Sequence, residues 1–278
     1  MIGIMQGRLS RPVAGRIQAF PVDTWLAEFD AARGAGLACI EWIYEAGTDE
    51  RNPLGSDEGI ERIRQRCAET GVAVWSVCAD YYMDRQLLHE DGTADDACVG
   101  HLRWLIERCG RLGVRNVVLP FVDSSSLRTD ARKEGLRRVL DGAARLAERA
   151  GLELHLETDL APDEFLALLR AVGQRVVRAN HDIGNSAALG YAARDEITAL
   201  SGWVGSVHVK DRRRGGGTVP LGTGSADFET SLSLIQRSGF DGPFILQVAR
   251  GTDGEEVGLA IQNRQFVERH LAGVAGTL

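Results

Sequence analysis

The chain has 278 residues, of which 44% are hydrophobic and 26% charged, and this composition is typical of a globular protein that buries a large core. Its formal net charge of −7 argues against nucleic acid as the main partner, because binding of a phosphate backbone requires a basic surface. No apolar run approaches the ~20 residues that span a bilayer, and the N-terminal MIGIMQGRLS has no signal-peptide pattern, so we expect no membrane partner.

Eight short apolar runs predict β-strands, each rich in Val, Ile and Leu and bounded by Gly, Pro, Asn or Asp. In chain order they are Ile2–Gly7, Cys39–Tyr44, Ala73–Ala79, Asn116–Phe121, Leu152–Thr158, Val177–Asp182, Ser206–Lys210 and Phe244–Ala249. Amphipathic segments such as Thr24–Ala35 and Arg128–Ala150 lie between them and predict helices. Glycines in GAGL, ETGVAV, RLGVRN, RAGLEL and RSGFDGPF mark the helix ends.

This alternation of strands and helices predicts a parallel sheet, because parallel strands need crossover helices. Eight such units in one chain most simply close into an α/β fold of the (β/α)8 TIM barrel type. A doubly wound open sheet is the alternative, but the first strand is followed by QGRLSRP and not by the dinucleotide-binding GxGxxG. No linker or composition change suggests a second domain, so we expect a single TIM-barrel domain over residues 1–278.

The cysteines give no sign of a disulfide framework or a CxxC metal site. They form an odd, scattered set: Cys39, Cys67, Cys78, Cys98 and Cys109. Such a pattern favours reduced thiols, and with them a cytoplasmic location.

Polar residues stand at the C-terminal ends of the last four predicted strands, where a TIM barrel places its active site. The four ends are HLETD from residue 155, NHDIGN from residue 180, HVKD from residue 208 and QVAR from residue 247. Alternation directs the polar side chains of the first of these strands toward the barrel axis, where an unpaired charge is costly. A divalent cation would compensate that charge, and three oxygens and one nitrogen are available from Glu157, Asp182, His208 and Gln247.

The motifs LETD, HDIGN, HVKD, PLGTGSADF and GPFILQ occur in this order along the chain. The set resembles the sugar isomerase/epimerase superfamily with the xylose isomerase-like barrel, and within it the ketose 3-epimerases, including pentulose-5-phosphate 3-epimerases. GIMQGRLS and SVCADYYMD also fit, so the resemblance covers nearly the whole chain. It implies a metal-dependent isomerase or epimerase that moves a proton next to the carbonyl of a small sugar or sugar phosphate, through an enediolate. It also implies assembly into homodimers or homotetramers.

The family's metal-binding glutamate, which doubles as an acid/base, corresponds to Glu157, and its aspartate and histidine correspond to Asp182 and His208. Its last ligand, a second catalytic glutamate in the epimerases, corresponds to Gln247. An amide oxygen still binds a metal, as in dehydratase-type relatives, but an amide takes no proton at neutral pH. We expect Mn2+ first, with Mg2+, Co2+ and Zn2+ as alternatives.

Epimerisation needs a second proton-transfer group on the other face of the substrate. With glutamine at 247, the groups available for this role are His155, His181, Lys210 and Asp211, of which we expect Lys210 and His155 to join Glu157 in catalysis. The residues expected to bind substrate are His181, Asn185, Arg250, Asp211 and Arg8. The basic segment DRRRGGG from residue 211 reads either as an anion clamp or as a solvated, mobile loop.

A reaction with one base avoids the need for a second proton-transfer group. The alternative function is therefore a metal-dependent lyase or dehydratase that acts on a keto-sugar or keto-cyclitol in the same site. A metal-dependent DNA-repair endonuclease of the same superfamily is disfavoured by the acidic chain. A binding module without catalysis is suggested only by Gln247.

Overall fold

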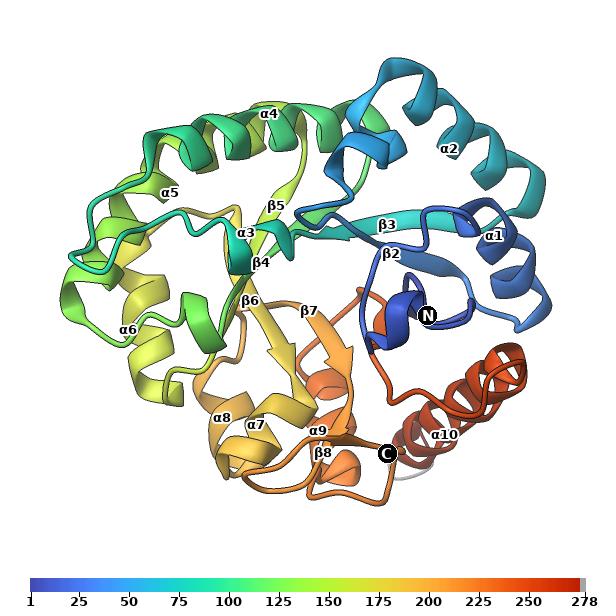
Figure 1. Cartoon of the computed structure of the whole chain (residues 1–278). Helices are drawn as coiled ribbons and strands as arrows, with labels where there is room; N and C mark the ends of the chain where they lie inside the picture. The colour runs from blue at the N-terminus through green and yellow to red at the C-terminus, as the bar shows by residue number, and fades with distance from the viewer. Residues whose placement is uncertain (276–278) are drawn as a thin grey trace.

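The computed structural model describes residues 1–275, and the last three residues of the predicted domain, 276–278, lie outside the described residues. Eight parallel strands close a barrel in the order β1-β10-β7-β6-β5-β4-β3-β2 (Figure 1). Their bounds are β1 Ile2–Met5, β2 Cys39–Ile43, β3 Ala73–Cys78, β4 Asn116–Phe121, β5 Glu153–Thr158, β6 Val177–Asp182, β7 Val204–Val209 and β10 Phe244–Leu246. The predicted (β/α)8 TIM barrel is confirmed.

Helices surround the strands (Figure 1). The longer ones are α1 Trp25–Gly34, α2 Asp57–Thr70, α4 Asp96–Leu112, α5 Asp130–Ala150, α6 Pro162–Val172, α9 Phe228–Arg237 and α10 Glu256–Ala275, and α8 Ala193–Ala199 is shorter. Two short helices, α3 Tyr81–Asp84 and α7 Ile183–Leu189, follow β3 and β6 at the C-terminal end of the barrel. Single-turn 3-10 helices are η1 Val13–Gly15, η2 Asp49–Arg51, η3 Pro53–Gly55 and η4 Asp123–Ser125.

The helix ends follow from local sequence signals. Side chains of Ser56, Asp95 and Thr129 accept backbone N–H bonds at the first turns of α2, α4 and α5. Gly71 and Gly113 end α2 and α4 in the left-handed conformation that side chains other than glycine rarely adopt. Among the described residues, no helix combines the length and the apolar character that a bilayer crossing requires.

The chain departs from the predicted elements at several strand ends and in the basic segment. β1 and β10 end at Met5 and Leu246, earlier than the predicted Gly7 and Ala249, because the chain leaves the barrel there to form its rim. β7 begins two residues before the predicted Ser206. The basic segment is a small antiparallel hairpin of β8 Asp211–Arg212 and β9 Thr218–Val219, in which Arg212 donates from Nε and Nη2 to the carbonyl of Gly216.

The barrel has an apolar shell and a polar interior. Between β2 and α1, the rings of Phe20, Trp25, Phe29 and Trp42 pack with centroids 5.4–6.4 Å apart. Inside the barrel, hydrogen bonds connect polar side chains that are almost completely buried. These interior residues are Glu41, Ser76, His155, Asn180, Ser206 and His208.

Candidate functional site

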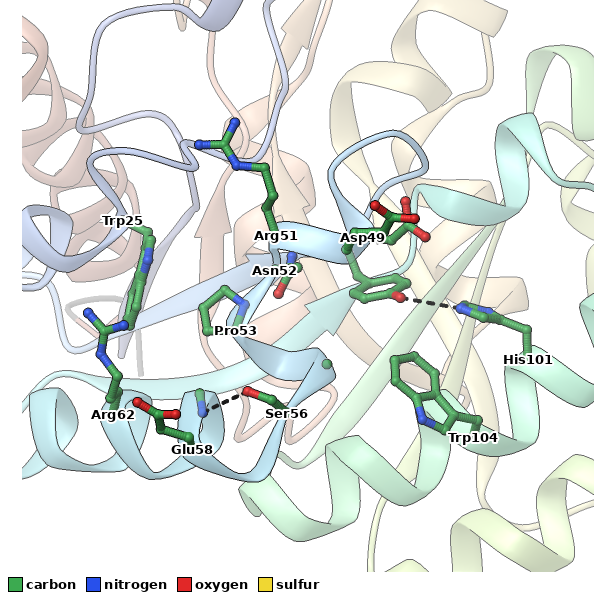
Figure 2. Close-up of a pocket in the computed structure, with 14 residues that line it drawn as sticks. Trp25, Asp49, Arg51, Asn52, Pro53, Ser56, Glu58, Arg62, His101 and Trp104 are labelled. Carbon is green, nitrogen blue, oxygen red and sulfur yellow. Dashed lines mark hydrogen bonds between the residues drawn. The ribbon is translucent and has the colours of Figure 1, made fainter.

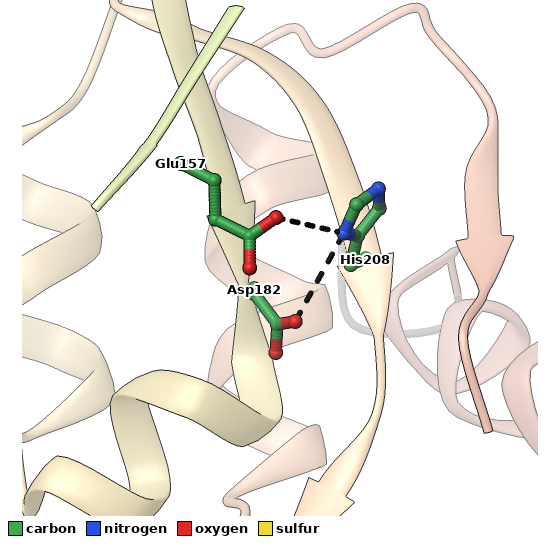
Figure 3. Close-up of side chains that lie close together, drawn as sticks. All are labelled: Glu157, Asp182 and His208. Atoms are coloured by element: carbon green, nitrogen blue, oxygen red, sulfur yellow. Dashed lines mark ion pairs between the residues drawn. The ribbon is translucent and has the colours of Figure 1, made fainter. Parts of the chain in front are cut away.

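Three of the predicted metal ligands lie together at the C-terminal end of the barrel. Glu157 on β5, Asp182 at the end of β6 and His208 on β7 point toward one another (Figure 3), and one ligand atom from each lies within 4.8 Å of the others. His208 Nδ1 is 3.4 Å from Glu157 Oε2 and 3.9 Å from Asp182 Oδ2. All three side chains are buried, so the cluster concentrates negative charge where water is scarce.

A carboxylate on the far side of the barrel orients the histidine of this cluster. His208 Nε2 lies 2.7 Å from Glu41 Oε1 on β2, and Glu41 Oε2 accepts a hydrogen bond of 2.6 Å from Ser76. Burial opposes a positive charge on His208, but the adjacent Glu41 and Glu157 carboxylates outweigh it and raise the pKa of His208 well above its usual value. The contact with Glu41 leaves Nδ1 directed at Glu157 and Asp182, as in metal sites where a carboxylate holds the second ring nitrogen.

Two asparagines hold Glu157 in place. Asn185 Nδ2 donates to Glu157 Oε1 at 2.7 Å, and Asn180 Nδ2 donates to Oε2 at 3.1 Å. The backbone N–H of Asn185 donates to Asp182 at 2.8 Å, while its side-chain oxygen accepts from Arg212 at 2.9 Å. Asn185 therefore lies at the cluster, where the sequence placed it, but its contacts are to the two carboxylates and to the hairpin.

Gln247 reaches the cluster through Lys210. Lys210 Nζ donates to Gln247 Oε1 at 2.9 Å and to Asp182 Oδ2 at 3.4 Å. The amide group of Gln247 also donates to Gln18 Oε1 at 3.2 Å. The structure thus brings Lys210 and Gln247 beside the three predicted ligands, and the ammonium group lies between the amide oxygen and Asp182.

A cavity of about 550 Å³ opens above the cluster. Glu157, Asn185, Lys210 and Gln247 line it, together with Asp159 from the predicted strand end and Arg212 from the basic segment. Other lining groups had no role in the sequence analysis: Gln18, Glu45, Asp80 and Arg128. Asp80 follows β3, so the same rule that selected the other strand ends would have found it. Burial raises the pKa of Asp80 to about 6, with smaller contributions from the charges of Glu157 and Glu45, against the hydrogen bonds from Gln18 and Cys78.

A second hollow, of about 570 Å³, lies between the segment after β2, α2 and α4 (Figure 2). Trp25, Tyr44, His101 and Trp104 line it, and the Tyr44 hydroxyl lies 3.3 Å from His101 Nε2. It shares no lining residue with the cavity above Glu157. The clustered carboxylates and histidine therefore identify the cavity above Glu157 as the candidate active site.

His155 lies deeper in the barrel than its predicted catalytic role requires. Its Nδ1 is 2.9 Å from Ser206 Oγ and its Nε2 is 2.8 Å from Glu153 Oε2, so both ring nitrogens already have partners. Burial lowers the pKa of His155, although Glu153 opposes this. The residue sits one inward-facing position before Glu157 on β5 and is absent from the cavity lining, so the arrangement does not support a catalytic role for His155.

His181 faces away from the candidate active site, contrary to the predicted contact with substrate. Side chains alternate along a strand, so Asn180 and Asp182 point into the barrel while His181 points outward. Its Nδ1 lies 3.7 Å from Glu196 on α8, and it lines a separate cavity of about 250 Å³ beside α7 and α8.

Two arginines that were expected to bind substrate, Arg8 and Arg250, donate mainly to backbone carbonyls instead. Arg8 donates to the carbonyls of Val248 and Ile17 and to the Gln18 side chain. Arg250 donates to the carbonyls of Ile17, Gly7 and Ser10. Both guanidinium groups therefore tie the loop after β1 to the segment after β10, and neither lines the cavity.

Asp211 is fully buried and holds the end of the hairpin loop, where the sequence suggested contact with substrate. Its Oδ2 accepts from the backbone N–H groups of Gly222 and Gly224 at 2.9 and 2.8 Å, and its Oδ1 accepts from Ala226 at 3.1 Å. Backbone N–H groups thus supply the hydrogen bonds that the buried Asp211 carboxyl group needs, and the same bonds fix the segment 222–226.

Replacing Asp211 with alanine is expected to lower the free energy of unfolding by about 2 kcal/mol or more, because bonds to a buried carboxylate are lost and their donors are left unpaired. Urea denaturation measures the change. Arg213→Ala, an exposed change in the same hairpin, should leave stability nearly unchanged. Full stability of Asp211→Ala with weakened substrate binding would restore the original prediction.

Comparison with known proteins agrees with the geometry. Residues 29–270 match the family model described as "Xylose isomerase-like TIM barrel". The L-ribulose-5-phosphate 3-epimerase of Shigella sonnei is 26% identical over 272 residues, which cover 92% of this chain and 93% of that protein. A solved L-ribulose 3-epimerase has a TM-score of 0.76 at 21% identity, covering 99% and 95% of the two chains. A barrel protein from Mycobacterium smegmatis, solved with magnesium, has a TM-score of 0.69 at 18% identity, covering 98% and 96%.

Proposed function

Because the chain belongs to the xylose isomerase-like TIM barrel family, we propose that it is a metal-dependent epimerase or isomerase of a small sugar or sugar phosphate. The observation that carries this proposal is the buried cluster of Glu157, Asp182 and His208, of which Glu157 lines the cavity. The epimerase named among the relatives supports the reaction class and a carbohydrate substrate. Homodimer or homotetramer assembly and a cytoplasmic location remain predictions.

The residues of the cluster fit a divalent cation. Two carboxylates and an imidazole nitrogen converge within 4.8 Å, and this donor set suits Mn2+ or Mg2+, and also Co2+ or Zn2+. Gln247 Oε1 would supply a fourth ligand once Lys210, which now donates to it, moves aside. When bound, the cation polarises the substrate carbonyl and stabilises the negative charge that develops on its oxygen.

Glu157 is the group that takes the proton from the carbon next to the carbonyl. It lines the cavity, and the amide groups of Asn180 and Asn185 fix its two oxygens, so the carboxylate has a single orientation toward a bound substrate. Lys210 donates to Asp182 and Gln247 and is placed to bond a substrate oxygen. A lyase that needs only this one base is the second candidate, favoured by the amide at position 247.

Deuterium exchange tests the proposal. Mn2+-loaded protein is incubated in D2O with a panel of ketoses and ketose phosphates, and NMR follows the hydrogen on the carbon next to the carbonyl. We expect exchange together with formation of the epimer or the isomer. Loss of water or an aglycone, seen by mass spectrometry, would select the lyase, and no exchange with any substrate would contradict both functions.

Replacing Glu41 with glutamine is expected to weaken Mn2+ binding about 10-fold, since loss of the partner of a metal-binding histidine typically costs 10–100-fold in affinity. Titration calorimetry gives the affinity. Glu196→Gln is a matched control, because Glu196 is also a buried carboxylate beside a histidine but lies outside the cluster. Equal effects of the two substitutions would mean that Glu41 acts only through general stability.

A further inference from the structure

Two residues before each member of the cluster, on the same face of the same strand, stands another buried polar side chain: His155 on β5, Asn180 on β6 and Ser206 on β7. His155 Nδ1 lies 2.9 Å from Ser206 Oγ. Ser206 donates to Asn180 Oδ1 at 2.6 Å, and Asn180 Nδ2 donates to Glu157 Oε2 at 3.1 Å. The same amide nitrogen lies 3.1 Å from His208 Nδ1, so this inner layer of three residues contacts two members of the cluster.

The two ends of the Asn180 side chain have opposite hydrogen-bonding character, so the orientation of its amide matters to the proposed base. The amide nitrogen donates, whereas the amide oxygen only accepts. With the nitrogen toward Glu157, the carboxylate gains a donor, but after a half-turn of the amide an oxygen would face it and repel it. Ser206 favours the first orientation, because its hydroxyl donates to the amide oxygen on the other side.

Resting on the proposed function, we propose that Ser206 is a positioning residue for Glu157 and that it acts by setting the orientation of the Asn180 amide. Ser206 does not line the cavity, so its effect on the base passes through Asn180. Without the hydroxyl, the Asn180 oxygen loses this partner and the amide is free to turn. Glu157 then keeps the bond from Asn185 at Oε1, but its second oxygen is no longer fixed. The base therefore spends less time in the orientation that reaches the substrate carbon.

Deuterium exchange measures the effect on the base. In D2O with Mn2+ and a ketose substrate, Ser206→Ala is expected to lower kcat for exchange about 10-fold, the equivalent of one hydrogen bond, with KM unchanged within about twofold. Ser206→Thr keeps the hydroxyl and should recover most of the rate. Ser206→Cys, which keeps a weak donor, is the second variant if the alanine protein does not fold, and its loss should be intermediate. Ser231→Ala, a change of a buried serine on α9 outside the barrel interior, is the control and should match wild type.

A double-mutant cycle separates positioning through Asn180 from a general structural role. Asn180→Ala should itself lower exchange about 10-fold or more, since Glu157 loses the same donor. Adding Ser206→Ala to this variant should lower exchange no further, because the route to Glu157 is already broken.

NMR of the Asn180 side-chain amide tests the positioning without metal or substrate. The signal is assigned by its absence from the spectrum of Asn180→Ala. In the wild-type protein, the amide hydrogen bonded to Glu157 should resonate downfield of a free amide, because it is bonded to a carboxylate. In Ser206→Ala it should lose most of this shift, and in Ser206→Thr it should keep it.

Several results would overturn the assignment. They are exchange by Ser206→Ala within about twofold of wild type, a rise in KM with kcat unchanged, and a folded Ser206→Thr that is as slow as the alanine variant. Additive losses in the double variant, or an unchanged Asn180 signal in Ser206→Ala, would show that Ser206 does not act through the amide. Absence of exchange in the wild-type protein would instead overturn the proposed function, and the NMR comparison would still decide whether Ser206 orients Asn180.

Discussion

Replacing Glu157 with glutamine is expected to lower both deuterium exchange and product formation by roughly 10³-fold, within the 10²–10⁴ range that a general base contributes. The amide keeps the size of the side chain but takes no proton. NMR in D2O reports exchange and product in one experiment. The variant is also expected to bind Mn2+ more weakly, because a charged ligand of the cluster becomes neutral.

Glu153→Gln is the matched control for this change. Glu153 stands on the same face of the same strand but at its opposite end, where it contacts His155 and Arg178. Activity of Glu153→Gln should stay within about threefold of wild type, as expected for a position outside the cavity. Retention of a tenth or more of the wild-type rate by Glu157→Gln would remove Glu157 from its proposed role as the base.

Manganese at a thousand times its dissociation constant is expected to raise the free energy of unfolding by about 4 kcal/mol, because a ligand that binds only the folded chain stabilises it by mass action. For a chain of this size, each kcal/mol corresponds to a rise in melting temperature of roughly 2–4 °C. Differential scanning calorimetry measures the shift without any substrate. A chelator should reverse it.

Asp182→Asn should abolish most of this stabilisation, since the substitution removes one of the two carboxylate charges that face His208 Nδ1. The matched variant Asp159→Asn changes a carboxylate in the same cavity that accepts a hydrogen bond from Ser126 and lies outside the cluster, so its shift with manganese should match wild type. A melting temperature that is unaffected by manganese, magnesium, cobalt and zinc in the wild-type protein would contradict a metal site here.

The strands and the three clustered ligands could be predicted from sequence because one rule governs both. A parallel strand buried on its two faces must be short, apolar and bounded by turn residues, and its C-terminal end must point to the common rim. Glu157, Asp182 and His208 stand at or near such ends, so their sequence positions already placed them together. The predicted bounds of β4 and β6 agree with the structure for the same reason.

The positions of the remaining site residues depend on the paths of loops and on contacts across the barrel. No local sequence pattern predicts either of these. Arg8 and Arg250 follow strands, as site residues in a TIM barrel do. Their guanidinium groups nevertheless donate to backbone carbonyls of the loops at the rim, and the paths of these loops could not be predicted from the sequence. Glu41 lies mid-strand among apolar neighbours and gains its role only from His208, 167 positions later. Strand alternation alone, however, could have predicted that the side chain of His181 points out of the barrel.

The hydrogen bond between Glu41 and His208 joins two strands that are far apart in the sequence, so the orientation of His208 depends on the complete barrel. β2 and β7 are not neighbours in the ring, so this bond exists only when the cylinder has closed through β1 and β10. A truncated polypeptide beginning at β4 would still carry Glu157, Asp182 and His208, but it would lack the Glu41 carboxylate that contacts His208 Nε2. The proposed binding of a metal ion therefore requires the completed ring and not only the half that supplies the donor atoms.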